Sequence, residues 1–188
     1  MSEVNRPRLL DAARLYAEIA VFRRGPEDLP VSALLLLLTI VAFLLVTLGL
    51  GSVMPVTAGN RIDLLALSAV FLLACYWVVL RLAGRPERFL QTLTAIFGFQ
   101  LMIAPINVGF RALFQRYATS DPLSLPVWFM LLGVILFVWT LAINGRILRS
   151  ATGWPLFSCV ALVVLQEFLG VFVILSVVPA AATPAVAP

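Results

Sequence analysis

Polar side chains that could do chemistry interrupt two otherwise apolar stretches of the chain. Gln100, Asn107 and Arg111 fall at positions i, i+7 and i+11 of one stretch, and Glu167 lies deep in another. At about 100° per residue the first three share one helix face, together with Ala104. Amides and a carboxyl on such a face can bridge helices, bind a polar solute or relay a proton.

The polar stripe and the carboxyl each admit a structural role and a functional one. Interhelical hydrogen bonding is the commoner role of such amides, and a pocket or path for a polar solute is the alternative. A rise of 1.5 Å per residue puts Gln100 roughly 17 Å and Glu167 roughly 20 Å from the same membrane surface, with Arg111 at roughly 33 Å. We therefore expect Glu167 to meet Gln100, and we disfavour a direct bridge to Arg111.

The composition indicates that the segments carrying these polar residues lie in a lipid bilayer. The chain has 188 residues, of which 62% are hydrophobic and 12% are charged. The charged share is about half that of a typical soluble domain. Mean hydropathy is +1.07, and the apolar residues fall in long runs, so we expect a membrane protein.

Five apolar runs are long enough to cross a bilayer as helices. Pro30, Pro126 and Pro179 flank three of them, Gly145 is expected to end the fourth, and Pro105 is expected to kink the third. The pattern predicts an all-α polytopic bundle with five transmembrane helices at 31–50, 64–80, 89–110, 127–143 and 154–178.

The basic residues predict the orientation of the bundle. All 13 are arginines, and ten of them fall on the side that holds the N-terminus. The positive-inside rule therefore places the N-terminus in the cytoplasm and the C-terminus in the periplasm, and the first span is read as an uncleaved signal anchor. Five of these arginines are candidates for binding anionic lipid headgroups, although topology alone also requires them there: Arg81, Arg85, Arg88, Arg146 and Arg149.

The first 30 residues predict a cytoplasmic amphipathic helix and a hinge. Residues 8–24 lack Pro and Gly and carry an apolar stripe that includes Tyr16 and Phe22. The helix either lies on the inner leaflet or on its own bundle, or it docks a cytoplasmic partner. We therefore expect three parts in the chain: the cytoplasmic helix and hinge at 1–30, the transmembrane domain at 31–178, and a disordered Pro/Ala-rich tail at 179–188.

Missing residue types argue against catalysis and cofactors. The chain has no His, and its two cysteines, Cys75 and Cys159, are too few for a Cys-only metal site. No phosphate-binding loop or nucleophile–base pair is visible. We expect a non-enzymatic protein with no cofactor and no nucleic acid partner.

A loose family resemblance covers residues 84–178. A short Arg-rich loop, Gly84-Arg-Pro-Glu-Arg-Phe-Leu-Gln91, leads into a helix with a mid-span proline, and a later helix ends at Trp139-Thr-Leu-Ala-Ile-Asn-Gly145-Arg146. With five helices and a cytoplasmic N-terminal segment, the chain resembles bacterial members of the Yip family, membrane proteins first known as partners of Rab-type GTPases. The resemblance implies a five-helix fold and a membrane-organising role.

Two functional hypotheses follow. The first is a bacterial inner-membrane scaffold or accessory subunit of a membrane complex, which contacts the lipid bilayer and a membrane-protein partner or a second copy of itself. The alternative is a small transporter or channel subunit that uses Gln100, Asn107 and Glu167. Five spans cannot supply two equal inverted repeats, which counts against the alternative unless an oligomer forms the pore.

Overall fold

The structure is a computed structural model that describes residues 9–20, 25–51, 61–120 and 126–177. These residues form helices and contain no strand. The elements in chain order are α1 (Leu9–Ala20), the 3-10 turn η1 (Pro26–Asp28), α2 (Ala33–Gly51), α3 (Arg61–Leu82), the 3-10 turn η2 (Pro86–Arg88), α4 (Phe89–Ser120), α5 (Val127–Thr152) and α6 (Leu156–Val177).

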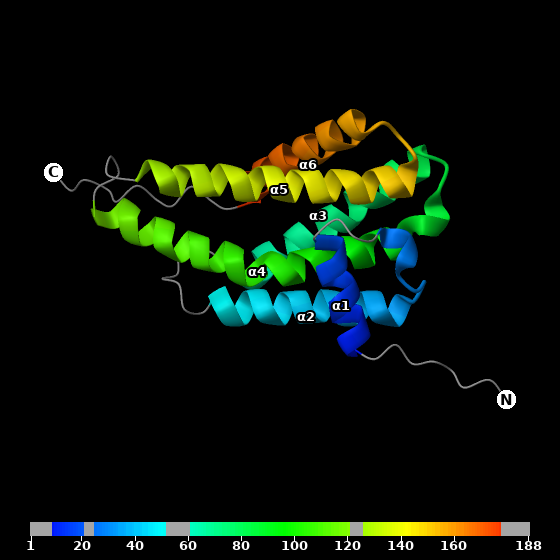
Figure 1. The fold of residues 1–188 in the computed structure, drawn as a ribbon, viewed down its shortest axis with the longest axis horizontal. Coiled ribbons are helices and arrows are strands. Elements are labelled where there is room, and N and C mark those ends of the chain that lie inside the picture. The colour runs from blue at the N-terminus through cyan, green and yellow to red at the C-terminus, as the bar shows by residue number, and fades with distance from the viewer. Residues whose placement is uncertain (1–8, 21–24, 52–60, 121–125, 178–188) are drawn as a thin grey trace.

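Helices α2 to α6 are each long and apolar enough to span a membrane, which confirms the predicted multi-pass bundle. In Figure 1, α2 runs beside α4, α5 runs beside α6, and α3 lies behind them. Helices α2, α4 and α6 begin, and α3 and α5 end, at the side where η1 lies. We call this side the η1 end and the opposite side the far end.

Three spans are longer than predicted. Helix α3 extends beyond both ends of the predicted range 64–80. Helix α4 continues through Pro105 to Ser120. Helix α5 continues through Gly145, so the prediction that this glycine ends the helix is wrong. Gly145 is buried where α5 meets α6, because a Cβ there would lie 2.6 Å from Cγ2 of Val160. The helix ends at Gly153, whose φ of +77° suits a left-handed C-cap and whose N–H donates to the Arg149 carbonyl at 2.8 Å.

The packed core lies toward the η1 end. The first half of α4 is almost completely buried, and it packs with buried side chains of α5 such as Ile143 and Ile147. Toward the far end, α4 exposes large apolar side chains, including Leu113 and Phe114. Phe129 is an exception there, since it is buried and stacks on Phe110 with ring centroids 4.4 Å apart. The bundle is therefore tight at one end and open at the other.

Helix α1 lies across the bundle and packs on α4 (Figure 1). Tyr16 and Ile19 are buried. A Cβ at Gly98 of α4 would lie 2.3 Å from Cδ1 of Tyr16, so the tyrosine ring occupies the space that the glycine leaves. The apolar stripe was predicted to face the inner leaflet, the protein's own bundle or a cytoplasmic partner. In the structure it faces the protein's own bundle.

Candidate functional site

The predicted polar stripe of α4 lines a cavity of about 390 Å³ between α2, α3, α4 and α6. Gln100, Asn107 and Arg111 all face it. Thr47 of α2 and Ser68 of α3 add hydroxyl groups to the same wall. We call this space the amide cavity. Three helices, α2, α3 and α4, thus bring five polar side chains together within the membrane-spanning part of the chain.

Several polar groups of the amide cavity lack a hydrogen-bond partner. The buried hydroxyl oxygen of Thr47 has none in the described part of the chain. The carboxamides of Gln100 and Asn107 likewise form no hydrogen bond with any residue that the structure describes. The interhelical hydrogen bonds expected of the stripe are therefore not present among these residues. Buried polar groups normally have partners, so the cavity is suited to a polar occupant.

Glu167 lies in a neighbouring cavity of about 240 Å³, which we call the charged cavity. Arg111 and Ser68 line both the charged cavity and the amide cavity. Gln100 does not line the charged cavity, and no hydrogen bond joins it to Glu167 within the described residues, so the expected meeting of the two side chains is not seen there. Arg111 and Glu167 share this space, but no ion pair joins them within the described residues.

The depths predicted for Gln100, Arg111 and Glu167 hold only for upright, parallel helices. Figure 1 shows α6 inclined relative to α5. Tilting a helix reduces the rise per residue along the membrane normal below 1.5 Å. Residues with different predicted depths can then lie closer together. The long side chain of Arg111 can also extend several ångströms along its helix. Both effects let Arg111 reach a cavity that Glu167 also lines.

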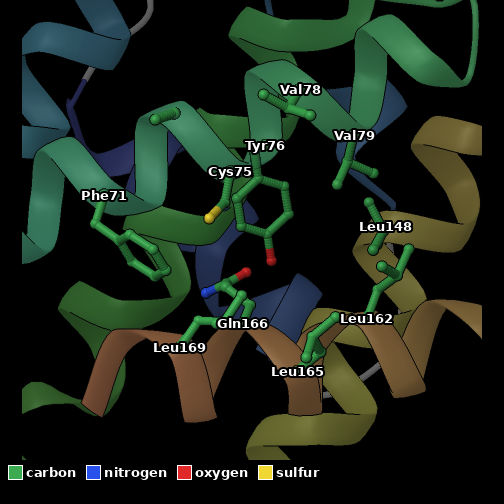
Figure 2. A pocket seen from close by; sticks show the side chains of 11 residues that line it. Phe71, Cys75, Tyr76, Val78, Val79, Leu148, Leu162, Leu165, Gln166 and Leu169 are labelled. Carbon is green, nitrogen blue, oxygen red and sulfur yellow. The ribbon is translucent and has the colours of Figure 1, made fainter. Parts of the chain in front are cut away.

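A third cavity of about 300 Å³ lies between α3 and α6 and has a mainly apolar lining (Figure 2). Phe71 and Gln166 line it and the charged cavity alike. Figure 2 shows the Tyr76 ring and the Gln166 carboxamide pointing into this space from opposite helices. Cys75 also lines it, and its thiol is free. The three cavities therefore adjoin one another along α3.

Sequence reasoning missed Thr47, Ser68 and Tyr76 as lining residues. Single hydroxyl side chains in a span often bond to their own helix, as Ser68 does by donating to the Leu64 carbonyl at 2.7 Å. An isolated Thr, Ser or Tyr therefore carries little signal in a sequence. Only the packing of the helices shows that Thr47 and Ser68 line the same cavity as the α4 stripe and that Tyr76 lines the cavity between α3 and α6.

The five arginines predicted to contact lipid headgroups differ in their surroundings. The Arg81 guanidinium lies over the Trp77 ring, 4.9 Å from its centroid. Nη1 of Arg88 donates to the Ser150 carbonyl at 2.7 Å. The Arg85 guanidinium lies against Gly153, since a Cβ there would be 3.2 Å from its Nη2. The other two arginines, Arg146 and Arg149, line a groove between α5 and α6.

The hinge at η1 is fixed to the ends of α4 and α5. Nε2 of Gln91 donates to the Leu29 carbonyl at 2.9 Å, and the Ser150 hydroxyl donates to the Glu27 carboxylate. Leu29 is buried beneath these contacts. The link between α1 and the first span is therefore part of the packed η1 end.

Within the described ranges, no group of three or more His, Cys, Asp or Glu side chains is placed to hold a metal ion. Comparison with known proteins gives no further guide to the site, because no known family, curated protein or solved structure matches the chain.

Proposed function

We propose that the chain is a non-enzymatic protein of the bacterial inner membrane, with its N-terminus in the cytoplasm and its C-terminus in the periplasm. The arginine distribution supports this orientation, because the end of α3, the link from α3 to α4 and the end of α5 together carry five arginines at the η1 end. The all-arginine basic set supports a bacterial source, and the Yip-like stretches support a membrane-organising fold. Reporter fusions at Gly25 and Thr183 test the orientation: opposite sides are expected, and a shared side contradicts it.

The function that the geometry supports best is the binding and carriage of a small polar solute within the membrane. The observation that carries this proposal is the amide cavity, where Thr47, Gln100 and Asn107 present polar groups that have no hydrogen-bond partner among the described residues. Unpaired polar groups away from water are unfavourable, so evolution rarely keeps them in a span without a use.

The lining also indicates how a solute would be held and passed on. The carboxamides of Gln100 and Asn107 each donate and accept hydrogen bonds, so they suit a neutral or zwitterionic solute. Arg111 contributes to both cavities, so a solute moving from the amide cavity to the charged cavity would stay beside the same cation. Glu167 would then balance that charge or exchange a proton.

A matched pair of threonine variants tests the amide cavity. Thr47→Val removes an unpartnered hydroxyl from the cavity, whereas Thr140→Val removes a hydroxyl that donates to the Leu136 carbonyl of its own helix at 2.9 Å. The purified protein is screened by thermal shift against amino acids, sugars and nucleosides. We expect a stabilising solute for the parent and for Thr140→Val, and a lost response in Thr47→Val and in Gln100→Leu. Equal responses in all four proteins would contradict the proposal.

Glu167→Gln tests carriage separately from binding. In reconstituted vesicles with a pH-sensitive dye, we expect the parent to couple solute entry to proton movement. The variant keeps the shape of the side chain but loses the titrating group, so coupled flux should fall at least tenfold while the thermal-shift response remains.

A role as a scaffold or accessory subunit is the second candidate function, and the packing of α1 on the bundle favours it. One face of α1 is packed on the bundle, and the exposed Arg14 forms an ion pair at 3.1 Å with the half-buried Glu18. A fixed helix with an exposed polar face suits a membrane-protein partner or a second copy of the chain. Arg14→Gln with Glu18→Gln should preserve the melting temperature and abolish co-purification in mild detergent. Recovery of a lone monomer from the parent would count against this role.

A further inference from the structure

A groove of about 630 Å³ runs between α5 and α6 at the η1 end. Arg146 and Arg149 of α5 line it together with Gly153, and Ala142, Leu156 and Val160 supply apolar surface. The two helices meet nearby, where Val160 packs against Gly145. The groove is separate from the three cavities along α3 and shares no lining residue with them.

The polarity of the groove changes along the helix axes. Arg149 and Gly153 lie at the end of α5, Arg146 lies about one turn further in, and Ala142 lies one turn beyond that. On α6, Leu156 begins the helix and Val160 follows one turn deeper. Cationic surface therefore gives way to apolar surface on moving from the membrane boundary toward its centre. This is the polarity of a phospholipid whose headgroup is anionic.

Two neighbouring arginines, Arg81 and Arg88, do not line the groove. Arg88 donates to the Ser150 carbonyl, and Arg81 lies over Trp77. A carboxylate is also near, because the hydroxyl of Ser150, a groove residue, donates to Glu27. Three arginines still converge on this end of α5, since the Arg85 guanidinium lies against Gly153. Positive charge exceeds negative charge beside the groove.

We propose that this groove binds one anionic phospholipid, with its phosphate between Arg146 and Arg149 and an acyl chain along Ala142, Leu156 and Val160. Guanidinium groups bind phosphate through paired N–H donors, and their apolar stems can lie along the chain. The absence of a Cβ at Gly153 keeps the Arg85 guanidinium close to the headgroup position. With the proposed orientation, the lipid belongs to the cytoplasmic leaflet, where anionic lipids attract basic residues.

The test uses full-length protein that is delipidated in a neutral detergent and titrated with dioleoyl-phosphatidylglycerol or dioleoyl-phosphatidylcholine, with binding read by native mass spectrometry. Each arginine near an anionic lipid contributes about fivefold, so Arg146 and Arg149 together should contribute about 25-fold to the preference for the anionic lipid. Arg146→Gln with Arg149→Gln should lower that preference by about 25-fold. Arg81→Gln removes a charge at the same end outside the groove and should keep affinity within about twofold of the parent.

A second pair of variants tests the acyl-chain part without changing charge. Leu156→Trp fills the groove, whereas Phe157→Trp enlarges an adjacent side chain that is 85% exposed and outside the groove. We expect Leu156→Trp to lose binding of the anionic lipid at least tenfold and Phe157→Trp to retain it. If the double arginine variant does not fold, this pair of variants still tests the proposal.

Three results would overturn the proposal. Equal loss in Arg81→Gln and in the double arginine variant would indicate general surface charge. Full competition by excess inorganic phosphate would indicate a phosphate site that needs no acyl chain. Unchanged binding in Leu156→Trp would show that the lipid lies elsewhere. None of these outcomes depends on whether the amide cavity carries a solute.

Discussion

Single small residues decide where the large side chains of this bundle pack. Gly98 has no Cβ, and the ring of Tyr16 occupies the space that a Cβ would need. The Tyr16 hydroxyl lies 2.7 Å from Oγ1 of Thr39, and Thr39 itself donates to the Leu35 carbonyl. Tyr16 is therefore the donor in this pair. An apolar stripe in a sequence predicts that such a helix is amphipathic, but it does not identify the glycine opposite.

Gly98→Ala should therefore displace α1. A new methyl group 2.3 Å from Cδ1 of Tyr16 cannot be accommodated by a small shift. Overpacking of this kind costs about 1–3 kcal/mol, and the melting temperature in detergent should fall. Gly109→Ala in the same helix is the control, because a Cβ there meets nothing within 4 Å. A stability of Gly98→Ala equal to that of the control would contradict the predicted packing of α1.

The same tyrosine gives the docking of α1 a dependence on alkaline pH. Burial raises the pKa of Tyr16 above its ordinary value of 10.0, and the hydrogen bond with Thr39 opposes part of that rise. Because the folded state holds the proton more tightly, its stability is complete below pH 10 and falls as the pH rises beyond it. We expect the melting temperature of the parent to fall above about pH 10 and that of Tyr16→Phe to fall less. Tyr76 and Tyr117 remain in both proteins, so parallel curves would refute the role of Tyr16.

At the scale of elements, helix existence was predictable and helix ends were not. The apolar runs located all five spans, because a span needs about 20 apolar residues whatever its neighbours are. The end of α5 was misplaced at Gly145, since glycine ends a helix in one context and permits close helix packing in another. Val160 distinguishes the two cases, and it lies on the next helix.

The hinge η1 shows how a short element is held by its neighbours. Gln91→Leu should loosen it, because the Leu29 carbonyl loses the amide that donates to it at 2.9 Å. Leaving such a buried group unpaired costs about 1–3 kcal/mol. Hydrogen–deuterium exchange should increase at residues 25–32. Thr94→Val is the control, because its hydroxyl donates to the Leu90 carbonyl of its own helix. No increase in exchange relative to this control would show that other contacts hold η1.

At the scale of the whole molecule, the bundle and the stripe could be predicted, but the cavities could not. The spacing of Gln100, Asn107 and Arg111 indicated a shared face, and these residues do line one space. Which of them Glu167 approaches depends on the inclination of α6, which no local pattern encodes. The contrast between a packed η1 end and an open far end likewise arises from how α1, α2, α3 and α5 converge on α4, whose first half is almost completely buried.

Deletion of residues 1–24 tests whether α1 is part of this convergence. The five spans remain, and Arg81, Arg85 and Arg88 still orient them, so we expect insertion with unchanged topology. The bundle should nevertheless lose stability, because Tyr16 and Ile19 no longer cover α4. Burying two such side chains contributes about 3–6 kcal/mol, which should appear as a large fall in melting temperature.

Partner association should fall in the truncated chain for the same reason, and the polar-face variants separate the two effects. Arg14→Gln with Glu18→Gln removes an ion pair whose arginine is exposed, which contributes about 0–1 kcal/mol, and leaves Tyr16 and Ile19 of the packed face unchanged. If this variant keeps both its stability and every co-purifying partner while the truncation loses both, α1 serves the bundle by packing. If the variant loses partners at full stability, the exposed face of α1 is the docking surface. A truncated chain as stable as the parent would contradict the packing of α1 on α4 that both interpretations require.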